Sequence, residues 1–417
     1  DSQWSITHSD GAFSSSSSSL TILGDRTDYC IVTSQKRTVA PATNFAMVVI
    51  STASRVIVAC NIYVSAGGTL LHRDLLLRLL TETQEHCRRS NKNETQSQST
   101  TMKEQQRVAV VHAFRDGPYD RSSFHLAGSP ALVADVGSSL AGRAIRSLSL
   151  LETNCDNDEK SDDAMTGMDG CDASHPQESN TNETIEQRHP TVGLVDHVSV
   201  LPLKDEAATI ITGSVARDIG EAIKALGADV LYYGRAHPSG KELAAVRRES
   251  TRFFESSKSN SNSLLATVST KAAGQVTVGA PPRFVENYNI RLQPNVGKKI
   301  ARTLTESVRE RSGRGLPSVE ALTLKYGQDQ YEVACNLLDP TVTSSKDIEN
   351  RMRLWEKQQQ RQNEDTEESL GLIETAYRVG TTTDMCLEAL REVSTEDGEI
   401  AHNNLVLKRL ETDFLIK

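Results

Sequence analysis

The sequence lacks the short motifs by which several large enzyme classes are recognised. It contains no GxGxxG after a strand-like run, no GxxxxGK[ST], no GxSxG and no HExxH. These motifs bind a pyrophosphate at a helix start, cradle phosphates, present a nucleophilic serine and hold zinc, respectively. Dinucleotide-binding, P-loop, α/β-hydrolase and zincin interpretations are therefore left without the residues on which they depend.

Paired cysteines and long apolar runs are also missing. The seven cysteines are scattered, odd in number and form no CxxC pair, a pattern typical of reduced thiols in the cytosol rather than of a zinc site. No run of about 18 apolar residues is present to cross a bilayer, and no signal peptide is recognised. We expect a cytoplasmic protein without a metal and without a membrane partner.

Aromatic residues and positive charge are scarce. Aromatics make up 5% of the 417 residues, and the formal net charge is −9. Nucleic-acid binding needs a basic face, and single-strand binders add aromatic stacking platforms, so no nucleic-acid partner is expected. The 37% of apolar residues predicts an aliphatic core divided between two modest domains.

Polar tracts rich in Ser, Asn, Gln, Asp and Glu interrupt the chain, and low hydrophobicity predicts that they are disordered. Such tracts surround residues 14–19 and occupy 89–106, 152–187, 255–263 and 356–368. The paired prolines at 281–282 and the restart of the pattern after them predict a domain boundary. The expected organisation is a disordered region or extension at 1–54, domains at 55–281 and 282–395, and a tail at 396–417.

Apolar periodicity alternates between strand and helix once the inserts are removed. Adjacent hairpin strands mixed with crossover helices predict an α+β fold of two ferredoxin-like, split β-α-β subdomains rather than one doubly wound parallel sheet. Gly227 is expected to terminate a helix, since it follows an apolar stripe at helical spacing. Strands are expected at 55–64, 107–114, 229–234, 283–292, 319–326 and 331–338, and helices at 70–87, 129–148, 213–226, 296–308 and after 340.

The tract from His189 to Asp196 is the strongest candidate for chemistry. It places a histidine before a proline, then a glycine and a carboxylate, directly ahead of the apolar segment 197–203. A histidine so placed can act as a proton-transfer base near neutral pH. The residues alone leave two other interpretations open, since His189 can be a turn residue and Asp196 a carboxylate that caps local backbone amides.

An ordered series of segments resembles the formiminotransferase (glutamate formimidoyltransferase) domain of the formimidoyltransferase-cyclodeaminase family. The resemblance runs from about residue 56 to 390, and nothing resembles the cyclodeaminase half. It implies that 55–281 is the N-terminal subdomain and 282–395 a shortened C-terminal subdomain. The segments are 60–67, 115–118, 120–122, the tract at 189–196, 229–234, 278–280, 288–292 and 336–339.

The resemblance implies a transferase of histidine catabolism and one-carbon metabolism. It would move a formimino (or formyl) group from N-formiminoglutamate to nitrogen 5 of tetrahydrofolate, the co-substrate, in a groove between the subdomains of a possible homodimer. His189 would be the catalytic base and Asp196 the carboxylate that orients it. Substrate and folate contacts would come from Gly117, Pro118, Arg121, Asn289 and Arg291, since a guanidinium suits the glutamate carboxylates.

Other interpretations remain open for these residues. Arg121 and Arg291 can be surface ion-pair residues, His125 and His197 are assigned no role, and Tyr232 and Tyr233 are expected to be core or edge aromatics. The family's Pro-Asn-Phe-Ser-Glu-Gly tract is replaced by residues 62–67, Ile-Tyr-Val-Ser-Ala-Gly, which lacks an amide and a carboxylate. The alternative function is therefore a catalytically silent relative that binds folate or a protein partner.

Overall fold

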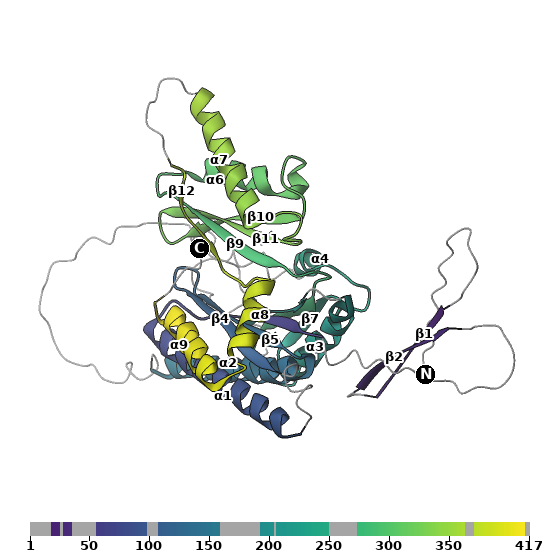
Figure 1. The fold of residues 1–417 in the computed structure, drawn as a ribbon. Coiled ribbons are helices and arrows are strands. Elements are labelled where there is room, and N and C mark those ends of the chain that lie inside the picture. The colour runs from purple at the N-terminus through teal and green to yellow at the C-terminus, as the bar shows by residue number, and fades with distance from the viewer. Residues whose placement is uncertain are drawn as a thin grey trace, which may run out of the picture.

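We describe the protein from a computed structural model. The structure describes residues 18–25, 28–35, 56–97, 107–158, 192–203, 206–249, 273–362 and 371–412. Figure 1 shows two units of sheet and helix, one above the other. Strands β1 (Ser18–Asp25) and β2 (Asp28–Gln35) pair with each other as a separate two-stranded antiparallel sheet.

The first unit is built around a six-stranded sheet in the order β4-β5-β3-β6-β8-β7. The strands β4, β5, β3 and β6 are antiparallel to their neighbours and follow the chain order β-α-β-β-α-β, which is the split β-α-β arrangement. Strands β6, β8 and β7 run parallel, since a helix crosses over between β6 and β7. The elements are β3 (Val58–Val64), α1 (Leu70–Ser97), β4 (Val108–Asp116), β5 (Arg121–Gly128), α2 (Pro130–Asp158), β6 (Val195–Pro202), α3 (Glu206–Lys224), β7 (Asp229–Gly234), α4 (Leu243–Glu249) and β8 (Gln275–Ala280).

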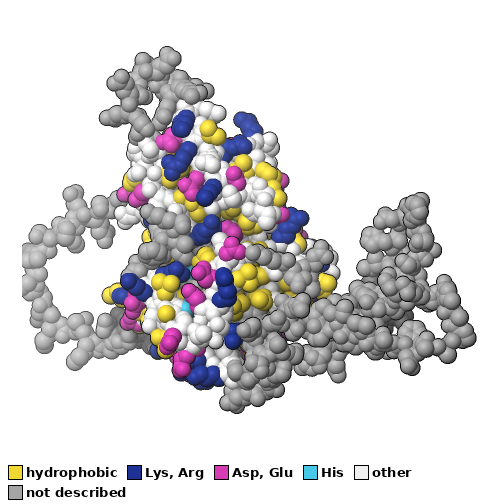
Figure 2. Space-filling view, in the orientation of Figure 1, with side chains coloured by type: hydrophobic (Ala, Val, Ile, Leu, Met, Phe, Trp, Pro, Cys, Tyr) yellow, Lys and Arg dark blue, Asp and Glu magenta, His cyan; other side chains and the backbone are white. Residues whose placement is uncertain are grey.

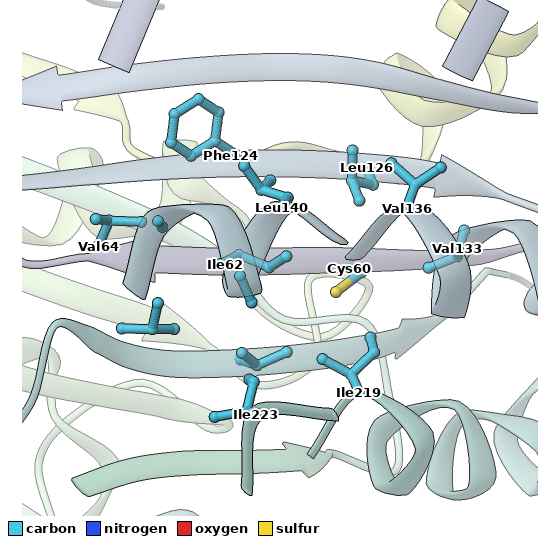
Figure 3. Close-up of a cluster of buried hydrophobic side chains, with 14 of the residues drawn as sticks. Cys60, Ile62, Val64, Phe124, Leu126, Val133, Val136, Leu140, Ile219 and Ile223 are labelled. Carbon is cyan, nitrogen blue, oxygen red and sulfur yellow. The ribbon is translucent and has the colours of Figure 1, made fainter. Parts of the chain in front are cut away.

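The core of this unit lies between one face of the sheet and helices α1, α2 and α3. Successive side chains of a strand point to opposite faces, so Cys60 and Ile62 of β3 face the helices. Figure 3 shows them between Leu140 of α2 and Ile219 of α3, with Phe124 of β5 alongside. Apolar burial against these helices is the main stabilisation of the unit.

The second unit repeats the split β-α-β arrangement around a four-stranded sheet in the order β10-β11-β9-β12. Every neighbouring pair is antiparallel, and α6 and α7 cover one face, where Ile290, Leu304 and Ile348 are buried. The elements are β9 (Glu286–Leu292), α6 (Lys298–Val308), a 3-10 turn (Glu310–Ser312), β10 (Val319–Tyr326), β11 (Gln330–Leu337), α7 (Ser345–Gln362) and β12 (Ile373–Arg378).

The last two helices return to the first unit. Cys386 and Ala389 of α8 (Thr383–Glu392) pack against apolar residues on the sheet face that α1 to α3 leave uncovered. Val406 of α9 (Glu396–Thr412) joins the core of the first unit. His402 of α9 hydrogen-bonds through Nε2 to the carbonyl of Val110 on the edge strand β4 at 2.8 Å, so α9 covers the open edge of the sheet.

The prediction of an α+β fold with two split β-α-β units is confirmed. Gly227 has φ +89° and its N–H donates to the Lys224 carbonyl at 2.9 Å, as expected for a helix end. Strands β8 and β12 were not expected, and neither was the pair β1 and β2, which lies in the region predicted to be disordered or an extension. Helices α1, α2 and α7 extend to Ser97, Asp158 and Gln362, into tracts predicted to be disordered. In α7 the extension consists of Glu, Lys, Gln and Arg, which have good helix propensity.

The remaining parts of the predicted inserts, including 159–187 and 255–263, lie outside the described residues. Within the part of the chain that is described, no helix has the length and apolarity needed to cross a membrane. Acidic and basic side chains are interspersed on the face seen in Figure 2.

Candidate functional site

The face of the six-stranded sheet opposite α1 to α3 is polar over the part that α8 leaves uncovered. It is directed toward the four-stranded sheet, because Tyr63 Oη donates to Asn287 Oδ1 of β9 at 2.9 Å and the rings of Phe114 and Tyr377 lie 6.2 Å apart. A strand face that is polar yet buried needs internal hydrogen bonds. The polar side chains of this face are Asn61, Tyr63, Arg121, Ser123, His125, His197, Ser199, Tyr233 and Thr277.

Arg121 and Asp196, both predicted from sequence, contact each other. Arg121 Nη2 donates to Asp196 Oδ2 at 2.5 Å, and the two side chains are 13% and 0% exposed. The Val192 N–H donates to Asp196 Oδ1 at 3.2 Å. The guanidinium carbon also lies 4.6 Å from the centre of the Tyr63 ring. This is a largely desolvated ion pair, whose two charges depend on each other.

His197 extends the site on the other side of Tyr63. Their rings are stacked, with centroids 5.4 Å apart and 11° between planes. His197 Nε2 is 2.9 Å from Tyr233 Oη, which donates to Ser199 Oγ at 3.0 Å. Sequence reasoning gave His197 no role.

Arg247 of α4 is a second guanidinium at this face that sequence reasoning missed. Its Nη2 donates to Thr277 Oγ1 at 3.3 Å, and Thr277 Oγ1 donates to the carbonyl of Asp196 at 3.2 Å. Burial lowers the pKa of Arg247, and the Asp196 carboxylate opposes that shift. No local pattern marks it, since a short helix with two adjacent arginines resembles any solvated turn.

Two further histidines lie together at the buried part of the face. His125 Nδ1 and Nε2 are hydrogen-bonded to Asn61 Oδ1 and Ser123 Oγ at 2.8 and 2.9 Å, so its burial is satisfied by core hydrogen bonds. The ring of His112 stacks on it at 5.6 Å, and within the described residues neither His112 ring nitrogen has a hydrogen-bond partner. Burial lowers the pKa of both, that of His125 to about 3.

Gly117 and Pro118, predicted to contact substrate, lie in the turn between β4 and β5. The Asp120 N–H donates to the Gly117 carbonyl at 3.0 Å, and Asp120 has φ +49°. Asp120 Oδ1 in turn accepts from the N–H groups of Gly67 and Gly68 at 2.8 and 2.6 Å. A Cβ at Gly67 would come within 2.9 Å of two carbonyl oxygens of the β4–β5 connection, so only glycine fits where the two loops meet.

Asn289 and Arg291 lie on β9 of the other sheet. Both side chains donate to the buried carboxylate of Glu332, from Nδ2 at 3.2 Å and from Nε at 3.0 Å. The structure thus brings them together with each other and with Glu332, which sequence reasoning did not identify. His189 lies outside the described residues. No group of three or more His, Cys, Asp or Glu side chains that could hold a metal occurs in the described segments.

The fold and this face define a two-sheet α+β protein with a desolvated ion pair and several imidazoles held between its units. Residues 183–281 match the family model of the formiminotransferase domain, N-terminal subdomain. The chain is also 30% identical over 178 residues to the formiminotransferase cyclodeaminase-like protein of Arabidopsis thaliana, covering 39% of this chain and 58% of that protein. The chain is thus similar to formiminotransferase proteins over part of its length, and it spans little more than half the length of this relative.

Among solved structures, the periplasmic protease PqqL from Escherichia coli aligns with 98% of this chain and 46% of its own, at 9% identity and a TM-score of 0.17. A score at this level carries no information on fold or function.

Proposed function

We propose that the protein is a folate-dependent transferase that moves a formimino group from N-formiminoglutamate to nitrogen 5 of tetrahydrofolate. The observation that carries the proposal is the buried Arg121–Asp196 pair on the polar face of the first sheet. A guanidinium fixed in a water-poor site is suited to a ligand carboxylate, which both glutamate-containing substrates possess. The proposal places the reaction in histidine catabolism, in the cytoplasm, with no metal.

His189 is the proposed base of the reaction. Three peptide units separate it from Val192, a span of at most about 11 Å, and the Val192 N–H is bound to Asp196. The neutral imidazole would take the proton of nitrogen 5 as that nitrogen attacks the formimino carbon. It would return the proton to the glutamate nitrogen as the old C–N bond breaks. Asp196 would then hold both Arg121 and the segment that carries the base.

Substrate contacts are proposed from both units. The turn at Gly117 and Pro118 precedes Arg121, the first residue of β5, so the turn sets the backbone position from which the guanidinium extends. Asn289 and Arg291 would contact the folate from the second sheet, with Glu332 holding their side chains in place. The second candidate function, a silent folate-binding relative, is favoured by the replaced motif at 62–67, where Tyr63 stands in place of the family's asparagine. A homodimer remains a further proposal from the family alone.

The test is calorimetric titration with tetrahydrofolate, followed by turnover with formiminoglutamate for the wild type and His189→Ala. We expect binding in both proteins and turnover in the wild type alone. A titration of Asp196→Asn with formiminoglutamate tests the role of the ion pair, since an Arg121 that Asp196 no longer holds in place would bind the donor more weakly. Binding without turnover would support the silent relative, and no binding would show that the family resemblance extends only to the fold.

A further inference from the structure

Glu332 of β11 is a fully buried carboxylate at the meeting of the two units. Its Oε1 accepts hydrogen bonds from Tyr377 Oη at 2.6 Å and from Arg291 Nε at 3.0 Å. Its Oε2 accepts from Tyr119 Oη at 3.0 Å and from Asn289 Nδ2 at 3.2 Å. Four donors to one carboxylate compensate its desolvation, although burial still raises the pKa of Glu332.

Three of the four donors belong to the sheet of Glu332 itself, and Tyr119 is the exception. Tyr119 lies in the turn between β4 and β5 of the six-stranded sheet, and its ring also meets Tyr326 edge-on at 5.2 Å and 86°. Tyr326 in turn lies under the Arg291 guanidinium at 3.6 Å. Tyr119 of the first unit therefore hydrogen-bonds to a carboxylate whose other three donors belong to the second unit.

The turn that carries Tyr119 is also fixed from within its own unit. The Tyr119 N–H donates to Asp116 Oδ1 at 3.2 Å, and Asp120 accepts from the Gly67 and Gly68 N–H groups. Arg121 follows immediately, and its guanidinium binds Asp196 at 2.5 Å. Only Asp120 separates Tyr119, which binds the second sheet, from Arg121, which binds Asp196. Each of these three residues is held by at least one hydrogen bond of its side chain.

We propose that Glu332 is a positioning residue for the site: by holding the Tyr119 hydroxyl, it fixes the turn from which Arg121 enters β5 and so sets where the guanidinium lies. The inference deepens the proposed function and rests on it for its consequence in substrate binding. The placement of Arg121 itself does not depend on any substrate. A carboxylate in the second unit would in this way control a ligand contact in the first.

The matched pair of variants is Tyr119→Phe and Tyr377→Phe. Each removes one hydroxyl that donates to Glu332, but Tyr377 is on β12 of the second sheet, whereas Tyr119 is on the turn before Arg121. Both variants keep the aromatic ring and the other three donors to Glu332, which favours folding. Thermal unfolding verifies that each variant is folded. Glu332→Gln is less suitable, because it leaves the largely buried Arg291 without its counter-ion.

The first readout uses the resting protein. The Arg121 side-chain Nε–H resonance, assigned by its loss in Arg121→Lys, should shift in Tyr119→Phe and stay unchanged in Tyr377→Phe. An unchanged resonance in folded Tyr119→Phe, or equal shifts in both variants, would overturn the inference. This readout is independent of turnover, so an inactive wild type would refute the proposed function while the positioning role is still decided.

The second readout is kinetic. We expect Tyr119→Phe to raise the KM for formiminoglutamate by about tenfold with kcat within twofold, which is the signature of weakened uniform binding. In an Arg121→Gln background, Tyr119→Phe should have no further effect, since both changes act through one guanidinium. Effects that multiply in the double variant would show that Tyr119 acts by another route and would contradict the assignment.

Discussion

Acid should destabilise this protein through the two buried histidines of the polar face. His125 is fully buried, and burial lowers its pKa to about 3 from a value of 6.5. The folded state therefore keeps the ring neutral, while the unfolded chain binds a proton as the pH falls below about 6.5. Stability from this group is complete above the unfolded pKa and falls as the pH drops toward the folded one.

The magnitude follows from the pKa difference. One pKa unit corresponds to about 1.4 kcal/mol, so lowering the pH from 7 to 5, about 1.5 units below the unfolded pKa, costs about 2 kcal/mol through His125. His112 adds a loss of the same sign, because burial lowers its pKa and the neighbouring His125 and Arg409 oppose a further positive charge. Against a total stability of about 5–15 kcal/mol for a typical domain, this is a large fraction.

Urea unfolding at pH 7 and pH 5 measures the effect. His125→Gln removes the titrating ring, so its free energy of unfolding should fall by about 2 kcal/mol less than that of the wild type between the two pH values. The common contribution of the carboxylates cancels in this comparison. His237→Gln is the control, because the His237 Nδ1 accepts from the Ser239 N–H in the turn after β7, and the wild-type pH dependence should persist in this variant. The reasoning is refuted if His125→Gln loses as much stability as the wild type.

Three other outcomes are expected. Asp196→Asn leaves the Arg121 guanidinium largely buried without its counter-ion and should lower the free energy of unfolding in urea by about 3–5 kcal/mol; a loss below about 1 kcal/mol would mean that solvent screens the pair. Ile62→Ala should cost about 2–5 kcal/mol by opening a cavity, whereas Leu354→Ala, at a side chain 56% exposed, should stay within about 0.5 kcal/mol. Ellman's reagent should modify at most three of the seven thiols in the native protein and all seven in denaturant. Burial raises the pKa of the four buried cysteines to about 12, so a fourth fast-reacting thiol would contradict this expectation. The protected residues are Cys60, Cys87, Cys335 and Cys386.

Local sequence patterns predicted the strands that consist of an apolar run bounded by turn residues. Strand β7 and strand β10 have the expected bounds, since apolar runs with flanking turn residues mark them. Strand β5 was given no bounds, although its core residues Phe124 and Leu126 alternate with Ser123 and His125 of the polar face. Such alternation marks two faces of a strand but does not tell whether the polar face meets solvent or a second sheet.

The candidate site was predictable only in part for a related reason. Asp196 and Arg121 could each be chosen from sequence, but their contact depends on β5 and β6 flanking β3 in the sheet, which no local signal gives. Glu332 carries no signal at all, because a lone glutamate between Tyr331 and Val333 in a hairpin strand normally faces solvent. Its hydrogen-bond partners are brought together by neighbouring strands of its own sheet and by Tyr119 of the first unit, which is a tertiary arrangement.

The sequence does not mark where the first unit ends, because its last helix is identified only by tertiary contacts. Residues 396–417 were predicted to be a tail, yet α9 buries Leu410 in the first core and directs His402 to the free carbonyl of Val110. Strand β4 has a register shift between Val110 and His112, and such a bulge leaves a backbone group unpaired at an edge. A histidine from some 290 residues later in the chain satisfies that group. The first unit is therefore completed by a helix that follows the second unit in the chain.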